Sequence, residues 1–306
     1  MRDIIFEIRN RLNASQEELA NMIGTSFATV NRWENGHSKP NKAAQLRLYD
    51  VCKANNVDFQ DIIQEKIKLG MFYHGSKSGI KGPIAPISRE HCDFGRGFYM
   101  GTEPRQPLTL ISDFDQSKFY IVSFDITELQ VLRVNPDINW AMLVAFNRGK
   151  LNTRTALYKK YSEMTKGYDV IIGSIANDRM FYVLDNFFLG NITDKALVKS
   201  LSALQLGQQY VAVTEKAYKQ VTIEKEIELS YLERVYLRDL SEAERTKGIN
   251  LANQICRDYR REGLFFDEIL AMGDSYEPYS ANFAIFRDDY LSFQLIMAVK
   301  ISSKVL

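Results

Sequence analysis

Two short stretches of the chain combine residue types suited to holding a flat, nitrogen-bearing ring. The first is Phe72–Ser76, in which His74 ends an apolar run and stands beside Gly75. The second is Asp93–Met100, in which two glycines flank Arg96 and aromatic residues follow. A glycine lets the backbone approach a ligand closely, and an aromatic side chain offers a stacking surface. We predict that the two stretches form neighbouring strands that line a binding site.

These motifs resemble those of the ADP-ribosyltransferase superfamily, in its diphtheria-toxin and poly-ADP-ribose-polymerase branch. His74-Gly75-Ser76 matches the His-Gly-Ser motif of the first strand, and Gly95–Tyr99 matches the Gly-x-Gly-aromatic-Tyr motif of the second. The resemblance covers roughly residues 71–220 and is closest to small bacterial proteins linked to toxin–antitoxin or phage-defence loci. It implies an α+β domain with a split sheet that takes NAD as its substrate and needs no metal ion.

The resemblance also implies a role for each site residue. The Gly75 backbone would pair with the carboxamide of nicotinamide, Tyr99 would stack on the ring, and His74 would bond a ribose hydroxyl. The family's third position is a glutamate that opens a late strand, and here Gln209 stands there. A glutamine keeps a hydrogen-bond acceptor but cannot take up a proton. The residues implied for NAD binding are His74, Gly75, Ser76, Arg96, Gly97 and Tyr99, and those implied for catalysis are His74, Tyr99 and Gln209.

Three hypotheses for this domain stay open. The first is a mono-ADP-ribosyltransferase that cleaves the glycosidic bond of NAD and acts as a toxin or defence effector. Its partners would be a macromolecular or small-molecule acceptor and an antitoxin. The second is a transcription regulator that senses NAD or ADP-ribose without turnover, which the replacement by Gln209 favours. The third is a pure protein-interaction module.

The first 61 residues have the pattern of a small helical DNA-binding unit. A capping box at Ser15–Glu18 begins one short helix, and Gly24 ends it. Two short helices joined by a glycine turn form a helix-turn-helix. Ser15–Ala20 and Val30–Gly36 resemble the Cro/repressor-type family, whose second helix enters the major groove and which often binds DNA as a homodimer. The residues expected to face DNA are Gln16, toward a phosphate, and Phe27, Thr29, Asn31 and Arg32, toward base edges.

Composition places few limits on function. The chain has 306 residues, a length typical of about two domains, and 45% of them are hydrophobic. The net charge of +1 argues neither for nor against nucleic acid. The three cysteines stand far apart and show no metal-ligand spacing, so we expect no metal site and a reducing compartment. Without a signal peptide or a long apolar run, the sequence predicts a soluble cytoplasmic protein.

Patterns along the chain suggest four segments. We expect the DNA-binding domain at 1–61, a charged linker helix at 62–70, the α+β domain at 71–220 and an accessory subdomain at 221–306. Within the last segment, Val235–Leu237 looks extended, and a capping box at Ser241–Glu244 should begin a helix. Apolar runs at Ala281–Phe286 and Leu291–Val299 should complete that subdomain.

Replacement of Arg32 by alanine tests the DNA-binding prediction. Arginine forms paired hydrogen bonds with guanine, so Arg32→Ala should weaken specific binding by about 1–3 kcal/mol. The measurement is titration of a duplex selected by residues 1–70. If that fragment enriches no duplex from a random library, the repressor-like interpretation is wrong.

Overall fold

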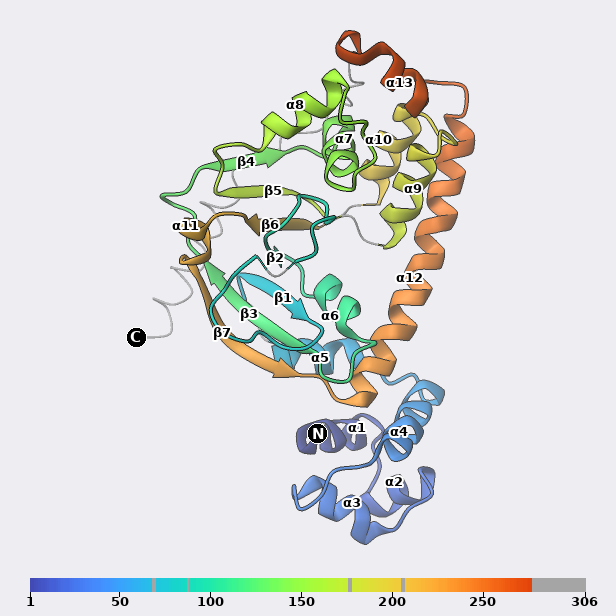
Figure 1. Ribbon diagram of the computed structural model, residues 1–306. Helices are drawn as coiled ribbons and strands as arrows, with labels where there is room; N and C mark the ends of the chain where they lie inside the picture. The colour runs from blue at the N-terminus through green and yellow to red at the C-terminus, as the bar shows by residue number, and fades with distance from the viewer. Residues whose placement is uncertain (68–69, 87, 176–177, 205–206, 277–306) are drawn as a thin grey trace, which may run out of the picture.

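The computed structural model describes residues 1–67, 70–86, 88–175, 178–204 and 207–276. The chain begins with a bundle of short helices (Figure 1). Its N-terminal capping box is present, because the Ser15 hydroxyl accepts from the Glu18 backbone and the Glu18 carboxylate accepts from the Ser15 backbone. Gly24 ends that helix with a positive φ of 64°. The helices are α1 (Arg2–Arg11), α2 (Gln16–Met22), α3 (Phe27–Glu34), α4 (Lys42–Ala54) and α5 (Phe59–Ile67).

A mixed seven-stranded sheet forms the centre of the rest of the molecule. Its order is β4-β5-β6-β2-β1-β3-β7, with β4 and β5 parallel and every other neighbouring pair antiparallel. The strands are β1 (Phe72–Ser76), β2 (Phe98–Gly101), β3 (Lys118–Phe124), β4 (Val131–Val134), β5 (Val170–Ser174), β6 (Gln208–Ala212) and β7 (Val221–Glu228).

The sheet divides into two groups of strands between β1 and β2. These strands are in register at one pair, Tyr73 with Gly101, whereas β1 and β3 are paired along five residues. Figure 1 shows the two groups diverging from this junction. An α+β domain with a mixed sheet is therefore confirmed, and its weakest internal pairing lies between the two motif strands.

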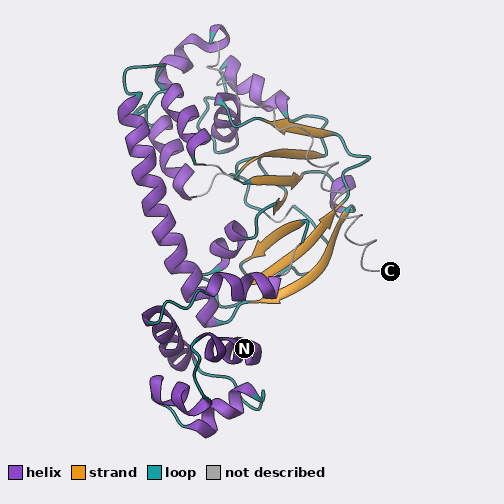
Figure 2. Cartoon of the chain, turned by 180° about the vertical axis from the view of Figure 1, so that it is seen from behind, coloured by secondary structure: helices purple, strands orange, loops and turns teal. Residues whose placement is uncertain are grey.

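Helices cover the β4-β5-β6 end of the sheet. The apolar helix α7 (Ile138–Asn147) packs with α9 (Asp178–Phe188) and α10 (Asp194–Ala203) around Trp140, which is fully buried. Figure 2 shows these helices between the strands and one long helix that runs along the molecule. The remaining helices are α6 (Arg105–Ile111), α8 (Ala156–Met164), α11 (Glu215–Tyr218), α12 (Tyr231–Asp258), α13 (Phe266–Met272) and a 3-10 turn at Gly273–Ser275.

The long helix α12 overturns two expectations for the last third. Val235–Leu237 is helical rather than extended, and the helix begins after Ser230 rather than at Ser241. The capping box that begins the helix is formed by Ser230 and Glu233. Glu233 is fully buried and also binds Lys66, which favours a helix start at this position. Strand β7 pairs with β3, so the sheet continues past residue 220. Ala281–Phe286 and Leu291–Val299 lie outside the described residues.

The N-terminal bundle and the sheet domain share two helices, which contribute different residues to the two apolar cores. Leu232 and Val235 of α12 belong to the apolar core of the bundle, and Leu237 belongs to the core beneath α6. Helix α5 is divided in the same way, since Ile62 packs in the bundle and Ile63 packs against the sheet domain. The described part of 221–306 is thus a connection between two cores. None of the described helices is long and apolar enough to cross a membrane.

Leu232 provides a test of this arrangement. Leu232→Ala should lower the free energy of unfolding by about 2–5 kcal/mol, because the side chain is fully buried in the bundle core. Chemical denaturation of the full chain measures the change. The matched control is Leu251→Ala on the same helix, where the side chain is 42% exposed and the cost should be small. Equal costs for the two variants would contradict the burial of α12 in the bundle core.

Candidate functional site

The side chain of His74 occupies the point where β1 and β2 separate. Its Nδ1 atom lies 2.7 Å from the backbone oxygen of Tyr99, and its ring stacks on Phe98 with centroids 4.4 Å apart. The regular pairing of the two strands is at Tyr73 and Gly101. The His74 ring therefore fills the opening beyond that pair, and we call this place the fork.

The fork presents one hydrogen-bond acceptor without a partner. A carbonyl oxygen can only accept, so Nδ1 of His74 carries the hydrogen and donates to Tyr99. Burial lowers the pKa of His74, which keeps the ring neutral. Its Nε2 atom is buried and bonds no atom among the described residues. Leaving such an atom unpaired costs about 1–3 kcal/mol, and a hydroxyl or N–H donor of a ligand would satisfy it.

Glycines beside the fork are needed for packing inside the protein. A side chain at Gly75 would place its Cβ 2.5 Å from the Pro107 backbone oxygen of α6. A side chain at Gly97 would come within 2.6 Å of the Ala212 backbone oxygen on β6. Gly75 therefore allows β1 to pack closely against α6, and Gly97 allows the glycine-rich stretch to pack closely against β6. Ser76 is buried at the end of β1.

Arg96 stands outside the fork. Its side chain is 61% exposed, and its guanidinium lies 3.9 Å from the Glu90 carboxylate. The side chain can thus approach an anion in solvent, and within the described ranges no contact shorter than this one fixes its direction.

Tyr99 and Gln209 face the side of the sheet opposite to the His74 ring. Gln209 opposes Gly101 and Tyr99 opposes Val211, so the alternation of strand residues places both side chains on one face. Phe98, on which His74 stacks, faces the other way. The structure joins His74 to Tyr99 through the backbone, but it does not gather the three predicted side chains into one pocket.

The Tyr99 hydroxyl is used inside its own loop. It donates to the Gly95 backbone oxygen at 2.7 Å and accepts from the Phe94 backbone at 3.0 Å. Burial, together with the nearby Asp93 carboxylate, raises the pKa of Tyr99, so the phenol stays neutral. Tyr99 thereby holds the glycine-rich loop against the sheet.

A buried polar cluster surrounds Gln209. Its Nε2 atom donates to the Ser174 backbone oxygen at 3.1 Å and lies 3.4 Å from an Asp93 carboxylate oxygen. The other Asp93 oxygen accepts from Arg148 at 2.7 Å, and the Arg148 guanidinium lies 4.1 Å from the Phe181 ring centroid. Sequence reasoning did not single out Asp93 and Arg148, which stand 55 positions apart. The one feature of the sequence that could have pointed to Asp93 is its position at the start of the glycine-rich stretch.

Several residues predicted to face DNA are instead engaged within the bundle. Gln16 donates to Glu34 at 2.6 Å and accepts from Asn31 at 3.1 Å, so it links α2 to α3. Thr29 contributes its hydroxyl to the cap at Ser26. Phe27, by contrast, is 53% exposed, and Arg32 is exposed as well. Ala28 is also exposed on α3 and was missed by the sequence analysis, because alanine carries no polar group to mark it.

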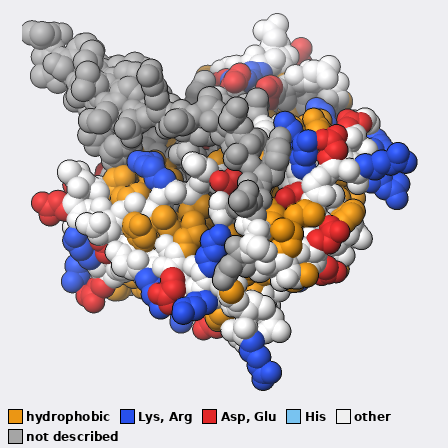
Figure 3. All heavy atoms as spheres, turned by 90° about the horizontal axis from the view of Figure 1, so that it is seen from above, with side chains coloured by type: hydrophobic (Ala, Val, Ile, Leu, Met, Phe, Trp, Pro, Cys, Tyr) orange, Lys and Arg blue, Asp and Glu red, His pale blue; other side chains and the backbone are white. Residues whose placement is uncertain are grey.

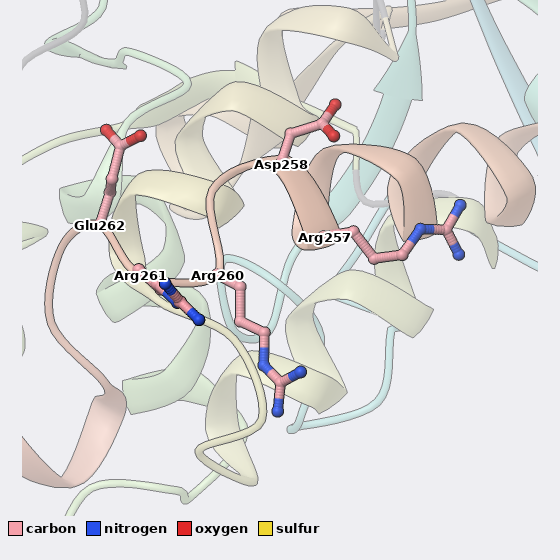
Figure 4. A pocket seen from close by; sticks show the side chains of 5 residues that line it. All are labelled: Arg257, Asp258, Arg260, Arg261 and Glu262. Atoms are coloured by element: carbon pink, nitrogen blue, oxygen red, sulfur yellow. The ribbon is translucent and has the colours of Figure 1, made fainter.

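A depression at the end of α12 is a weaker candidate. It is about 700 Å³ in volume and lies among five charged residues of 257–262. Figure 4 shows the Arg257 and Arg260 side chains pointing away from each other, so they do not converge on one ligand.

The face seen from above carries interspersed acidic and basic side chains around patches of hydrophobic ones (Figure 3).

Two family models match the chain. Residues 5–62 match a model described as helix-turn-helix, which confirms the predicted DNA-binding fold. Residues 71–223 match the model described as protein of unknown function (DUF3990). The chain belongs to the DUF3990 family. The DUF3990 match begins just before β1 and ends within β7, so it includes the fork and Gln209. No curated protein and no solved structure matches the chain.

The neutral state of His74 predicts a pH dependence of stability. The folded-state pKa lies below the ordinary 6.5, so the unfolded chain binds the proton more readily and stability should fall as pH drops below about 6.5. His74→Gln removes this titration while keeping a donor for Tyr99. Denaturation at pH 7.5 and 5.5 should therefore show a larger loss for the wild type, by at most about 1.4 kcal/mol per pH unit. Parallel losses in both proteins would contradict a neutral buried ring.

Proposed function

We propose that this chain is a DNA-binding regulator whose sheet domain binds NAD or an ADP-ribose compound at the fork. The helix-turn-helix match supports the regulator. The Nε2 atom of His74, which is buried and bonds no atom among the described residues, is the observation that carries the ligand proposal. It lies on the motif strand whose sequence resembles the NAD-binding strand of ADP-ribosyltransferases.

The chemistry of the fork suits a ribose hydroxyl. Because Nδ1 donates to Tyr99, the bare Nε2 offers a lone pair and needs a donor from the ligand. A ribose presents hydroxyl donors, and its attached base or nicotinamide presents a flat ring. The aromatic side chains Phe98 and Tyr120, with ring centroids 4.4 and 6.1 Å from that of His74, provide the apolar surroundings in which one such hydrogen bond is strong.

A physical connection joins the fork to the DNA-binding bundle. Gly75 of β1 lies directly against Pro107 of α6, and Arg105 of the same helix forms an ion pair with Glu244 of α12. Helix α12 in turn contributes Leu232 to the bundle core. A ligand that changes the separation of β1 and β2 would act on the DNA-binding bundle through these contacts.

The amide at Gln209 favours binding without turnover. Cleavage of the nicotinamide–ribose bond passes through a positively charged ribose, which a carboxylate stabilises better than an amide. The Gln209 amide nitrogen is already committed to the Ser174 backbone. We therefore rank the regulator above the enzyme.

The second candidate function is NAD-dependent mono-ADP-ribosyl transfer, in a toxin or defence setting. It is favoured by the Asp93 carboxylate, which lies 3.4 Å from the Gln209 amide nitrogen and places a negative charge beside the position where the related family has glutamate. In this reaction the bond from the ribose C1′ to nicotinamide breaks, and a nucleophile of a protein, nucleic acid, small molecule or water takes its place. For this reaction the ribose would have to lie on the face of the sheet that carries Tyr99 and Gln209, opposite to the His74 ring, and there Asp93 would stabilise the developing positive charge.

Titration of the full chain with NAD, ADP-ribose and nicotinamide tests the binding proposal. His74→Phe keeps the ring that stacks on Phe98 but removes the acceptor, so affinity should fall about five- to tenfold. The matched control is His91→Phe, because His91 also contacts a backbone oxygen through Nδ1 but is exposed on the loop. Wild-type protein that binds none of the three compounds at millimolar concentration would overturn the proposal.

Nicotinamide release from labelled NAD separates the two functions. The regulator should bind NAD and release no nicotinamide, and the duplex affinity of the full chain should change when NAD is added. The enzyme should release nicotinamide, and Asp93→Asn should then reduce the rate more than it reduces NAD affinity.

A further inference from the structure

The outer face of α3 presents two apolar residues and one free cation. Phe27 is 53% exposed at the first position of the helix, and Ala28 beside it is exposed. Arg32 is exposed, and its side chain forms no hydrogen bond or ion pair with any part of the chain that the structure describes. Figures 1 and 2 both place α3 at the end of the molecule farthest from the sheet.

Helix geometry places Ala28 and Arg32 on the same side of α3. They lie two residues before and two residues after Val30, which is fully buried, so both point away from the bundle. One helical turn separates them, or about 6 Å along the axis, which corresponds to about two base steps of DNA. Phe27 extends the apolar surface at the helix N-terminus, the end of a recognition helix that contacts base edges.

The polar residues of α3 are already engaged within the bundle. Asn31 donates to Gln16 and accepts from Asn35 at 3.1 Å, so both ends of its amide are used. Thr29 shares its hydroxyl with the Ser26 cap. An amide that read adenine would have to give up these bonds. The surface left for base contacts is therefore apolar at its N-terminal end and cationic one turn later.

We infer that Phe27 and Ala28 read the C5 methyl groups of thymine, about two base pairs from a guanine read by Arg32. Apolar side chains distinguish thymine by contact with its methyl group, which is exposed in the major groove, and arginine bonds O6 and N7 of guanine. This inference rests on the proposal that the bundle binds DNA, and it names the base chemistry that the bundle recognises.

Replacing thymine with deoxyuridine tests the inference, because the two bases differ only in the C5 methyl group. The full chain first selects duplexes from a random library, and each thymine of the enriched site is then replaced in turn. Loss of a contacted methyl should weaken binding about fourfold. Phe27→Ala should abolish that difference at one position and Ala28→Ser at its neighbour, while Arg32→Ala should remove the guanine preference.

Leu46→Ala is the matched control, since Leu46 is an apolar residue of the same bundle that is 41% exposed on α4. It should keep the full preference for thymine over deoxyuridine. The inference is overturned if the wild type binds both duplexes equally at every position, or if Phe27→Ala and Ala28→Ser keep the thymine preference. It is also overturned if Phe27→Ala leaves DNA binding unchanged and alters only the oligomeric state of the free protein, measured by sedimentation. That result would assign Phe27 to contact with a second copy of the chain. Failure to enrich any duplex would instead refute DNA binding itself.

Discussion

Different faces of α12 are buried in two separate cores, and this sets how the N-terminal bundle sits against the sheet domain. Leu232 and Val235 complete the core of the DNA-binding bundle, and Leu237 lies five residues after Leu232 in the core beneath α6. Hydrophobic burial is the main term that favours folding, so neither core can be completed without this helix. Polar contacts fix the same alignment, because the Asp239 carboxylate accepts from Tyr49 at 2.9 Å and pairs with Lys53 at 2.8 Å.

The start of α12 depends on a buried carboxylate. Glu233 is fully buried, a position that is costly for a charge unless it is paired and hydrogen-bonded. Here it accepts from the Ser230 backbone at 2.6 Å and from the Lys66 ammonium of α5 at 2.8 Å. This ion pair and the contact between the Phe59 and Tyr236 rings, whose centroids lie 5.5 Å apart, join the two helices that connect the domains, so the sheet domain meets the bundle in a defined orientation.

Local signals in the sequence identified much of the fold. The capping box at Ser15 and the turn at Gly24 predicted the helix-turn-helix, because both depend on bonds between near neighbours. The same kind of signal failed at Ser241, where an equally good capping pattern lies inside α12. Burial of Glu233 decided between the two patterns, and burial is a property of the tertiary structure.

The candidate site could be predicted only in part, for a similar reason. Placing His74 beside Tyr99 required only that two motif strands be neighbours. Which face each side chain occupies depends on strand register, which the motifs do not encode. The ion pair of Asp93 with Arg148 joins two residues 55 positions apart, and neither carried a signal of the other.

The length of α12 has a consequence for access to the fork. Its 28 residues make a rod about 42 Å long, and α3 lies beyond one end of it. A duplex bound along α3 meets the molecule at its tip, so the sheet domain projects away from the DNA axis. The proposed ligand site at His74 and the proposed DNA-binding face of α3 therefore lie on separate parts of the molecule, so any coupling between them has to pass through α6 and α12 and not through contact between the two ligands.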